Sequence, residues 1–503
     1  MIPATETRQW PLALRILRGR GQNGNAAKAT GHKLYNSGYA LVVNTAGTTA
    51  IGVAYWAVAA HLYGRQALGR TSAMISALIL VSSVAQLNLN NTLPRFLPLA
   101  GRRSGRLIRY CYGASSLTAL MVGLGFVIVM PHVSAQWRFL SETPLLAPAF
   151  VIATVVWGIF ALEDSALTGL GKAVVVPVEN TAYGVLKLLI LLGLASLFPA
   201  TGIFFSWLLP LFLIVPAVNW LMFGRYLRTD EWATAVATVR PREVVRFTGV
   251  DYIGSLLGQF YSNMLPLIVL TALGAAANGI FYVAWTITFG LTLVAQNFAT
   301  SMLVEGTAAP HRLAELTRGV LARCALIIAP CVGLLIVAAH PILTIYGSQY
   351  ADRATKLLGL LAMAVLPRSL VLVTFSLDRL AGRVGRATLT NLILTILVLG
   401  GSWLMLTHIG IDGVALAWGG GNLVIAALRL PTIIGAVRGV RGSEDAQAAS
   451  GSPPAQAPSN SALLARPTIP RLRRSGPPGR HRLAKGSSTI RLARPLGRRN
   501  RQH

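Results

Sequence analysis

Acidic residues are scarce in this chain: 16 Asp and Glu occur among 503 residues, against 45 Lys and Arg. Charged residues make up only 12% of the chain, and apolar residues make up 53%. A soluble protein carries about twice that share of charge. The scarcity therefore excludes an ordinary soluble protein. The apolar residues fall in long blocks, each able to cross about 30 Å of hydrocarbon, which predicts an all-α integral membrane protein.

Residues for redox, metal and covalent chemistry are also few. The three cysteines, Cys111, Cys324 and Cys331, all lie in apolar segments. The last two share one predicted helix about 10 Å apart, too far for a disulfide. The eight histidines include no His-x3-His pair, and neither a nucleophile elbow nor a phosphate-binding loop is present. We therefore expect no metal site, no cofactor and no enzyme activity.

Twelve apolar segments are long enough to be membrane spans. They are residues 36–60, 71–93, 107–130, 144–164, 173–198, 202–223, 244–270, 277–303, 319–339, 354–376, 387–407 and 413–437. A polar, charged loop separates two sets of six. The predicted domains are a basic N-terminal segment 1–33, a six-helix lobe 34–223, a linker 224–243, a second six-helix lobe 244–437 and a basic tail 438–503.

The two sets of six share a weak sequence repeat. The stretch from Gly64 to Leu93 recurs 210 positions later, where Gly64, Gly69 and Val84-Ala85-Gln86 match Gly274, Gly279 and Val294-Ala295-Gln296. Further along, Asn180, Gly202 and Trp207 match Asn391, Gly413 and Trp418 at an offset of 211. We interpret the chain as two copies of one membrane unit, which predicts pseudo-symmetric bundles.

Basic residues set the predicted orientation. With the N-terminus inside, Lys and Arg concentrate in the inner segments, and the outer loops hold only Arg65, Arg70, Arg138, Arg353 and Lys356. Both termini are then cytoplasmic. Residues 1–33 are polar and basic with no apolar core of a signal peptide. The tail is rich in Pro, Ser, Gly and Arg and is expected to be disordered. It either attracts anionic lipid of the inner leaflet or is merely solvated, and we expect no nucleic-acid partner.

Polar side chains form stripes along four of the spans. The stripes are Asn44, Thr48, Gly52 and Tyr55 on the first span; Ser83, Gln86 and Asn90 on the second; Asp251, Ser255, Gln259 and Ser262 on the seventh; and Thr292, Gln296 and Thr300 on the eighth. One such stripe fits helix–helix packing as well as a substrate path. Four stripes on the first two helices of both repeats predict a polar cavity between the halves.

Ionisable residues at depth are the sharper signal, because a charge at mid-bilayer costs at least ~2.5–3.5 kcal/mol. Lys187 lies near the middle of the fifth span, and we predict that it binds an anionic group; an ion pair with Glu179 is the alternative. Arg368 follows Pro367 in the tenth span and fits a functional or a structural role. Asp251 is either a ligand of a coupling ion or a partner for a basic residue.

Charges nearer the helix ends have simpler expected roles. Arg95 belongs to a basic cluster after the second span that either sets topology or captures a phosphate-bearing head group, with Arg95 nearest the cavity. Arg429 is expected to extend to the inner surface. The remaining ionisable residues at inner helix ends are expected to be solvated or to cap helices: Glu163, Asp164, Asp378 and Arg379.

The arrangement resembles a known family of transporters. Two six-helix lobes, Asn44 and Gly47 early in the first helix, the Gly64–Gly69 loop, the polar end of the second helix and the turn at residues 410–415 resemble the Wzx-like oligosaccharide flippases of bacteria. Their superfamily also contains multidrug extruders and the lipid II flippase. The resemblance implies two bundles that open alternately to each side of the inner membrane. It also implies a cargo of oligosaccharide on a polyprenyl (pyro)phosphate.

The function that follows is the transfer of a lipid-linked oligosaccharide from the inner to the outer leaflet, with Lys187, Arg95 and Arg368 balancing the phosphate charge. One alternative is a membrane scaffold that recruits polysaccharide-synthesis enzymes through the tail, and deletion of 439–503 would separate the two. Another is an ion-coupled exporter of small molecules. The first span carries no acid of the kind that proton-coupled drug extruders use, which disfavours drug export.

Overall fold

The computed structural model describes residues 47–227 and 241–449. Every regular element in these ranges is helical. All but the end of the last helix belong to one compact unit that ends at Glu444. Eleven helices of the described ranges are long and apolar enough to cross a membrane. Of the first predicted span, residues 47–62 are helical and the start lies outside the described ranges. The prediction of an all-α, multi-pass membrane protein is confirmed.

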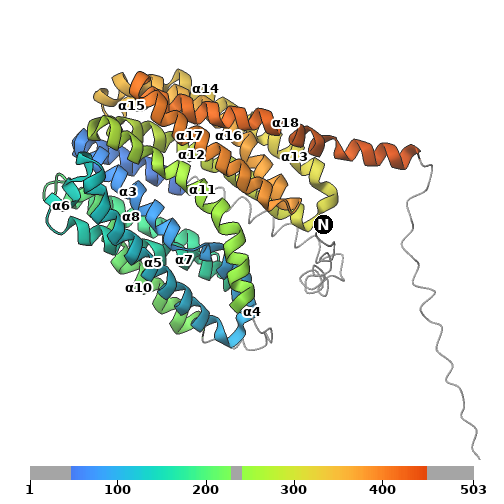
Figure 1. Cartoon of the computed structure of the whole chain (residues 1–503), viewed down its shortest axis with the longest axis horizontal. Coiled ribbons are helices and arrows are strands. Elements are labelled where there is room, and N and C mark those ends of the chain that lie inside the picture. Colours follow the sequence, from blue (N-terminus) through green and yellow to red (C-terminus); the bar gives the residue numbers. More distant parts are fainter. Residues whose placement is uncertain (1–46, 228–240, 450–503) are drawn as a thin grey trace, which may run out of the picture. The chain divides into compact units, whose positions relative to one another are not determined.

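The helices pack mainly with others of their own half. The first half contains α3 (Arg65–Ala85), α4 (Leu89–Ala100), α5 (Ser104–Val133), α6 (Phe139–Glu142), α7 (Leu146–Gly169), α8 (Val175–Leu194), α9 (Gly202–Leu208) and α10 (Leu211–Leu221). The second half contains α11 (Pro241–Leu273), α12 (Ala275–Ala308), α13 (Leu313–Arg323), α14 (Ala329–Val337), α15 (Ala339–Thr344), α16 (Ser348–Leu380), α17 (Val384–Ile409) and α18 (Ile411–Ala449). Helix α3 joins the halves because it packs on both α11 and α12 (Figure 1).

Some predictions concern parts of the chain that the structure does not describe. Residues 1–33, the predicted site residue Asn44, most of the linker and nearly all of the tail lie outside the described ranges. Asp251 lies on α11, but its side chain is not among those described. The division into five predicted domains therefore stays a prediction.

The second predicted span is not one helix. Helix α3 ends at Ala85, and α4 starts only at Leu89. Between them Leu87 and Asn88 adopt left-handed backbone angles, with φ of 50° and 61°. Asn tolerates this conformation because its short polar side chain bonds locally, and Asn88 Oδ1 accepts a hydrogen bond from Asn91 Nδ2 at 2.8 Å. The related helix α12 runs without a break through Gln296. The two copies therefore differ within the polar stripe, because the break lies between Ser83 and Asn90.

The two copies meet at a pair of glycines. A Cβ on Gly69 of α3 would lie 1.8 Å from the Ala275 carbonyl oxygen of α12, and a Cβ on Gly279 would lie 2.6 Å from the Arg65 carbonyl oxygen. Arg65 corresponds to Ala275, and Gly69 to Gly279, at the offset of 210. A contact that repeats with its partners exchanged is what a pseudo-twofold relation produces. The side chain of Asn278 secures the crossing by donating to the Gly69 carbonyl oxygen at 2.8 Å.

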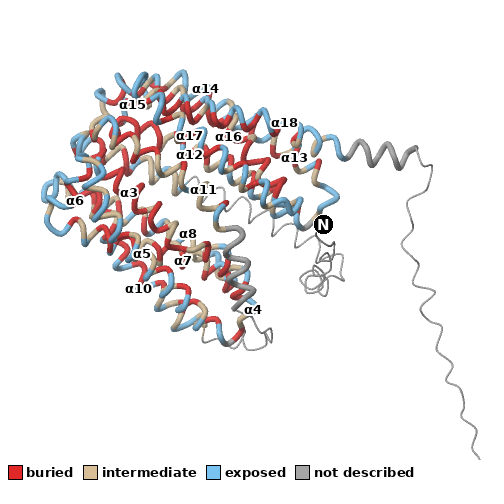
Figure 2. Tube along the Cα trace, viewed as in Figure 1, coloured by how far each residue is buried: buried red, intermediate tan, exposed pale blue. Residues whose placement is uncertain are grey.

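Apolar surface faces outward as well as inward. Helices α5 and α16 are equally apolar, with a mean hydropathy of 2.0 each, but 17% of the α5 window is buried against 67% for α16. Exposed residues run along the outer side of α14 (Figure 2) and include Leu334 and Val337. Apolar residues on such faces are stable only against lipid, as a multi-pass protein requires.

Candidate functional site

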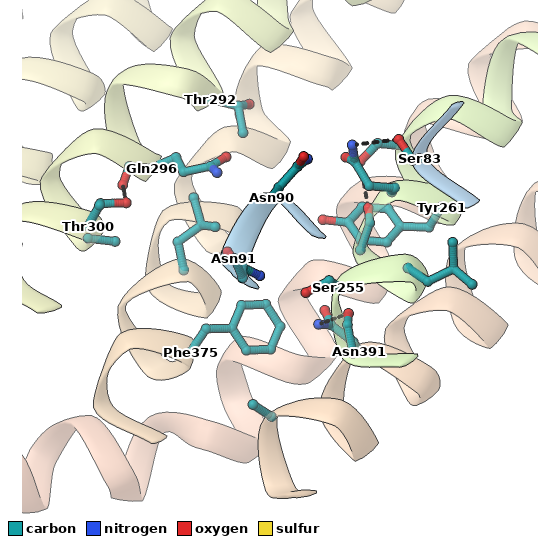
Figure 3. A pocket seen from close by; sticks show the side chains of 18 of the residues that line it. Ser83, Asn90, Asn91, Ser255, Tyr261, Thr292, Gln296, Thr300, Phe375 and Asn391 are labelled. Carbon is teal, nitrogen blue, oxygen red and sulfur yellow. Dashed lines mark hydrogen bonds between the residues drawn. The ribbon is translucent and has the colours of Figure 1, made fainter. Parts of the chain in front are cut away.

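A polar cavity of about 500 Å³ lies between the two halves; we call it the main cavity. Its walls come from the end of α3, from α4, and from α11, α12, α16 and α17. In the view of Figure 3, Asn90 of α4 lies between Gln296 of α12 and Ser83 of α3, and all three residues line the cavity. The volume is that of an ordinary small-molecule site. The cavity therefore lies where the sequence predicted one, between the repeats.

Amides and hydroxyls supply most of the polar groups in the main cavity. Gln259 Nε2 donates to Ser83 Oγ at 3.2 Å, which links α11 to α3. Asn90 Nδ2 donates to Gln86 Oε1, while Asn90 Oδ1 is buried and has no hydrogen-bond partner among the described residues. Gln296 is exposed to the cavity. Groups that both donate and accept suit a ligand rich in hydroxyls.

Charge in the main cavity has one sign. The described lining residues include Arg368 and Arg379 and no Asp or Glu. Arg368 is 9% exposed, and its Cζ lies 5.2 Å from the centroid of the Tyr261 ring. Its Nη1 is buried without a hydrogen-bond partner among the described residues. The guanidinium therefore places a positive charge at the cavity wall, held on an aromatic face, with one donor covered by protein and unused.

Lys187 lies in a second, smaller cavity of about 250 Å³, which we call the lysine cavity. Three aromatic rings surround its Nζ, with centroids at 4.2 Å for Trp207, 4.5 Å for Tyr55 and 5.4 Å for Tyr183. The side chain is buried, and the ion pairs among the described residues do not include it. Cation–π contacts therefore replace the carboxylate partner that the sequence analysis weighed.

The polar stripe of the first helix also belongs to the lysine cavity. Thr48 and Gly52 line it together with Asn180. Tyr55 donates its hydroxyl to the Ile203 carbonyl oxygen at 3.2 Å, within the first half. The expectation that the first helix lines the shared cavity is wrong for its described residues. Its described polar face instead meets α8 at the lysine cavity.

The predicted site residues thus divide into three groups. Five line the main cavity: Gln86, Asn90, Gln259, Gln296 and Arg368. Lys187 lies in the lysine cavity. Arg95 lines neither; it is exposed on α4, with its Cζ 5.8 Å from the Phe96 ring centroid. Whether any of these residues binds a substrate stays a prediction.

Two expectations about helix-end charges are wrong. Arg429 and Asp378 form a buried ion pair between α18 and α16, so Arg429 does not extend to the surface and Asp378 is not solvated. Glu163 is fully buried on α7 and accepts a hydrogen bond from Asn219 of α10. Position near a helix end was a poor guide to exposure, because side chains of neighbouring helices meet these acids: Asn219 of α10 meets Glu163, and Arg429 of α18 meets Asp378. No cluster of three metal-binding side chains occurs among the described residues.

Comparisons with known proteins identify the fold. No protein-family model matches the chain, and no curated protein matches its sequence. Among solved structures, it is similar to an inward-facing multidrug-resistance MATE family transporter of the MOP superfamily. That match has a TM-score of 0.60 and 15% identity, and it covers 78% of this chain and 96% of the other. An outward-facing structure of such a transporter gives a TM-score of 0.55 at 14% identity and covers 80% of this chain and 95% of the other.

A third similar structure is a MOP superfamily transporter from Pyrococcus furiosus, described as having a binding pocket of reverse polarity that suggests a different function. It gives a TM-score of 0.54 at 14% identity and covers 78% of this chain and 94% of the other. Identities this low establish the fold alone. The chain has the fold of MATE family transporters, and these solved relatives are transporters and not enzymes.

Proposed function

We propose that this protein is an alternating-access transporter that moves a polyprenyl-(pyro)phosphate-linked oligosaccharide from the inner to the outer leaflet of a bacterial inner membrane. The observation that carries the proposal is Arg368: a buried guanidinium with an unused donor, in a cavity whose described lining holds no acid. Such a site attracts an anion and repels the cations that many drug extruders carry.

The remaining lining fits the sugar part of such a cargo. Amide groups of Gln86, Asn90, Gln259 and Gln296 both donate and accept hydrogen bonds, as sugar hydroxyls do. The lipid chain would stay in the bilayer beside the cavity while the head group passes through it. Alternating access needs a closed contact on one side of the cavity, and the Gly69–Gly279 crossing supplies one.

The predicted topology gives the direction in which the cavity opens. With the N-terminus inside, the glycine crossing lies toward the outer surface, and Gln86 and Asn90 lie toward the inner one. The described state would then accept cargo from the cytoplasmic leaflet, where lipid-linked sugars are assembled. Partners on that side would be anionic lipids and polysaccharide-synthesis enzymes.

The test uses a strain that lacks the protein and is complemented with variants. We expect Arg368→Gln to lower surface polysaccharide by about tenfold or more, because a charge-assisted contact contributes ~1.5–3 kcal/mol, and undelivered lipid-linked sugar should accumulate. Arg368→Lys should retain part of the activity. Arg353→Gln, an exposed arginine on the same helix α16, is the matched control. Wild-type polysaccharide in the Arg368→Gln strain, at normal protein levels, would reject the proposal.

A further inference from the structure

Two phenylalanine rings contribute apolar surface to the largely polar main cavity. The described lining holds six aromatic side chains: Tyr252, Tyr261, Trp285, Phe289, Phe375 and Trp418. The two tryptophan rings are buried and meet edge to face, with centroids 5.2 Å apart. One tyrosine holds the Arg368 guanidinium, and the other donates to the Val84 carbonyl oxygen at 2.7 Å. Phe289 is 39% exposed and Phe375 is half-buried, so both rings keep apolar surface uncovered.

The two phenylalanine rings lie at different depths. Helices α12 and α16 pack on each other, and Ser376 Oγ of α16 donates to the Ala299 carbonyl oxygen of α12 at 2.7 Å. Phe375 precedes Ser376 and therefore lies near the level of Ala299. Phe289 comes ten residues before Ala299 on α12, which places it about 15 Å along the helix axis and nearer the glycine crossing.

Phe375 is the better placed of the two rings for binding a sugar. In the view of Figure 3, Asn91, Ser255 and Asn391 are the labelled side chains nearest its ring, and all four residues line the cavity. Amides and hydroxyls around an aromatic face suit a pyranose, which presents C–H bonds on its ring faces and hydroxyls at its edge. Phe289 instead has a tryptophan ring of its own helix as a neighbour, with centroids 6.1 Å apart.

The positive charge proposed to meet the phosphate lies on the same helix as Phe375. Arg368 and Phe375 are seven residues apart on α16, which is two turns and about 10 Å along the axis. Residues at this spacing share one face of a helix, and both line the main cavity. A phosphate beside Arg368 therefore leaves the sugar attached to it within reach of the Phe375 ring.

We propose that Phe375 is the stacking platform for the sugar next to the phosphate, and that the cargo carries at this position a pyranose with an uninterrupted face of C–H bonds. Stacking that face on the ring removes apolar area of both partners from water. The surrounding amides and hydroxyls meet the hydroxyls at the sugar edge. The inference rests on the proposed function and specifies which sugar the cavity recognises.

The test measures the binding of two probes to the purified full-length protein in lipid nanodiscs by isothermal titration calorimetry. One probe is geranyl pyrophosphate, and the other is the same molecule with glucose attached to its pyrophosphate. We expect the wild type to bind the glucose probe about fivefold more tightly, as a single aromatic stack allows. Phe375→Leu should lose this preference and bind the bare probe like the wild type, whereas Phe375→Tyr should keep the preference.

Phe212→Leu is the matched control, because Phe212 is exposed on α10 and does not line the main cavity. A preference that is absent from the wild type, or that survives in Phe375→Leu, would overturn the stacking site, while binding of the bare probe would still support the proposed cargo. Equal loss of affinity for both probes in Phe375→Leu would assign the ring a structural role and overturn the site. Loss of the preference in Phe289→Leu alone would place the sugar at the other ring. Binding of neither probe by the wild type would reject the proposed cargo, and the stacking site with it.

Discussion

The two halves of this protein share a helical plan but bury charge in different ways. At the offset of 211, Lys187 of the first half corresponds to Val398, which lies in the apolar core, and Glu179 corresponds to Thr390. The Thr390 hydroxyl donates to the Arg386 carbonyl oxygen of its own helix at 2.8 Å and needs no other partner. The first half thus holds charge at positions where the second half holds neutral residues.

The second half neutralises its own buried charge or directs it at the main cavity. Asp378 and Arg429 satisfy one another, and Arg368 faces the shared space. The duplicated units therefore differ in where each places its buried charge. The second half places Arg368 at the wall of the main cavity, whereas the first half encloses Lys187 in the lysine cavity.

The largest effect is expected from breaking the neutral pair of the second half. Asp378→Leu leaves the Arg429 guanidinium buried without its carboxylate, which should lower the free energy of unfolding by about 3–5 kcal/mol. Thermal unfolding in detergent measures this loss of unfolding free energy. The double variant Asp378→Leu/Arg429→Met should recover most of the loss. If the single variant unfolds like the wild type, the pair does not neutralise buried charge.

The contact that joins the halves should be the next most sensitive. Gly69→Ala places a methyl group against the Ala275 carbonyl oxygen, and such overpacking costs about 1–3 kcal/mol. We expect the crossing to loosen, so that a cysteine placed there reacts faster with a water-soluble reagent. Gly125→Ala is the control, since a Cβ at Gly125 meets nothing within 4 Å. Equal reactivity in both variants would show that the crossing does not hold the halves closed.

Replacing Lys187 by an apolar residue, as at the corresponding position of the second half, should raise stability and lower transport activity. Lys187→Met removes a buried charge that no described carboxylate balances, and we expect a gain of about 0.5–2 kcal/mol in unfolding free energy. Surface polysaccharide should fall at the same time if the amine serves transport. Paired measurements of unfolding temperature and polysaccharide level check this. A less stable but fully active variant would mean that the amine is only structural.

The smallest effect is expected from a neutral residue of the main cavity. Gln296→Leu removes one amide that is exposed to the cavity, and a neutral hydrogen bond contributes only about 0.5–1.5 kcal/mol. Transport should therefore fall by less than about tenfold. Dose-response curves for the cargo would measure the change. A loss as large as that of Arg368→Gln would place recognition in the amides and not in the charge.

Much of the fold could be predicted, because apolar block length and polar stripes are properties of single helices. The amide stripes led directly to Gln86, Asn90, Gln259 and Gln296 in the main cavity. Arg368 followed from the cost of a charge at depth.

What the sequence could not show is which neighbour each face meets. Lys187 was predicted as a charge at depth, but its enclosure also needs Tyr55 of the first helix and Trp207 of α9, whose approach the sequence does not show. Glu163 is buried and meets Asn219 of α10, a contact that its position in the sequence does not reveal. The break after Ala85 depends on two left-handed residues within an otherwise helical pattern. Only the folded arrangement determines these three features.

Movement of a lipid-linked sugar by the purified protein tests the central claim most directly. Vesicles containing the wild-type protein should transfer a fluorescent polyprenyl-pyrophosphate oligosaccharide between leaflets, and Arg368→Gln should slow the transfer by about tenfold or more while Arg353→Gln does not. Equal rates for all three proteins, or transfer only of cationic amphiphiles, would contradict a cationic cavity that carries an anionic head group.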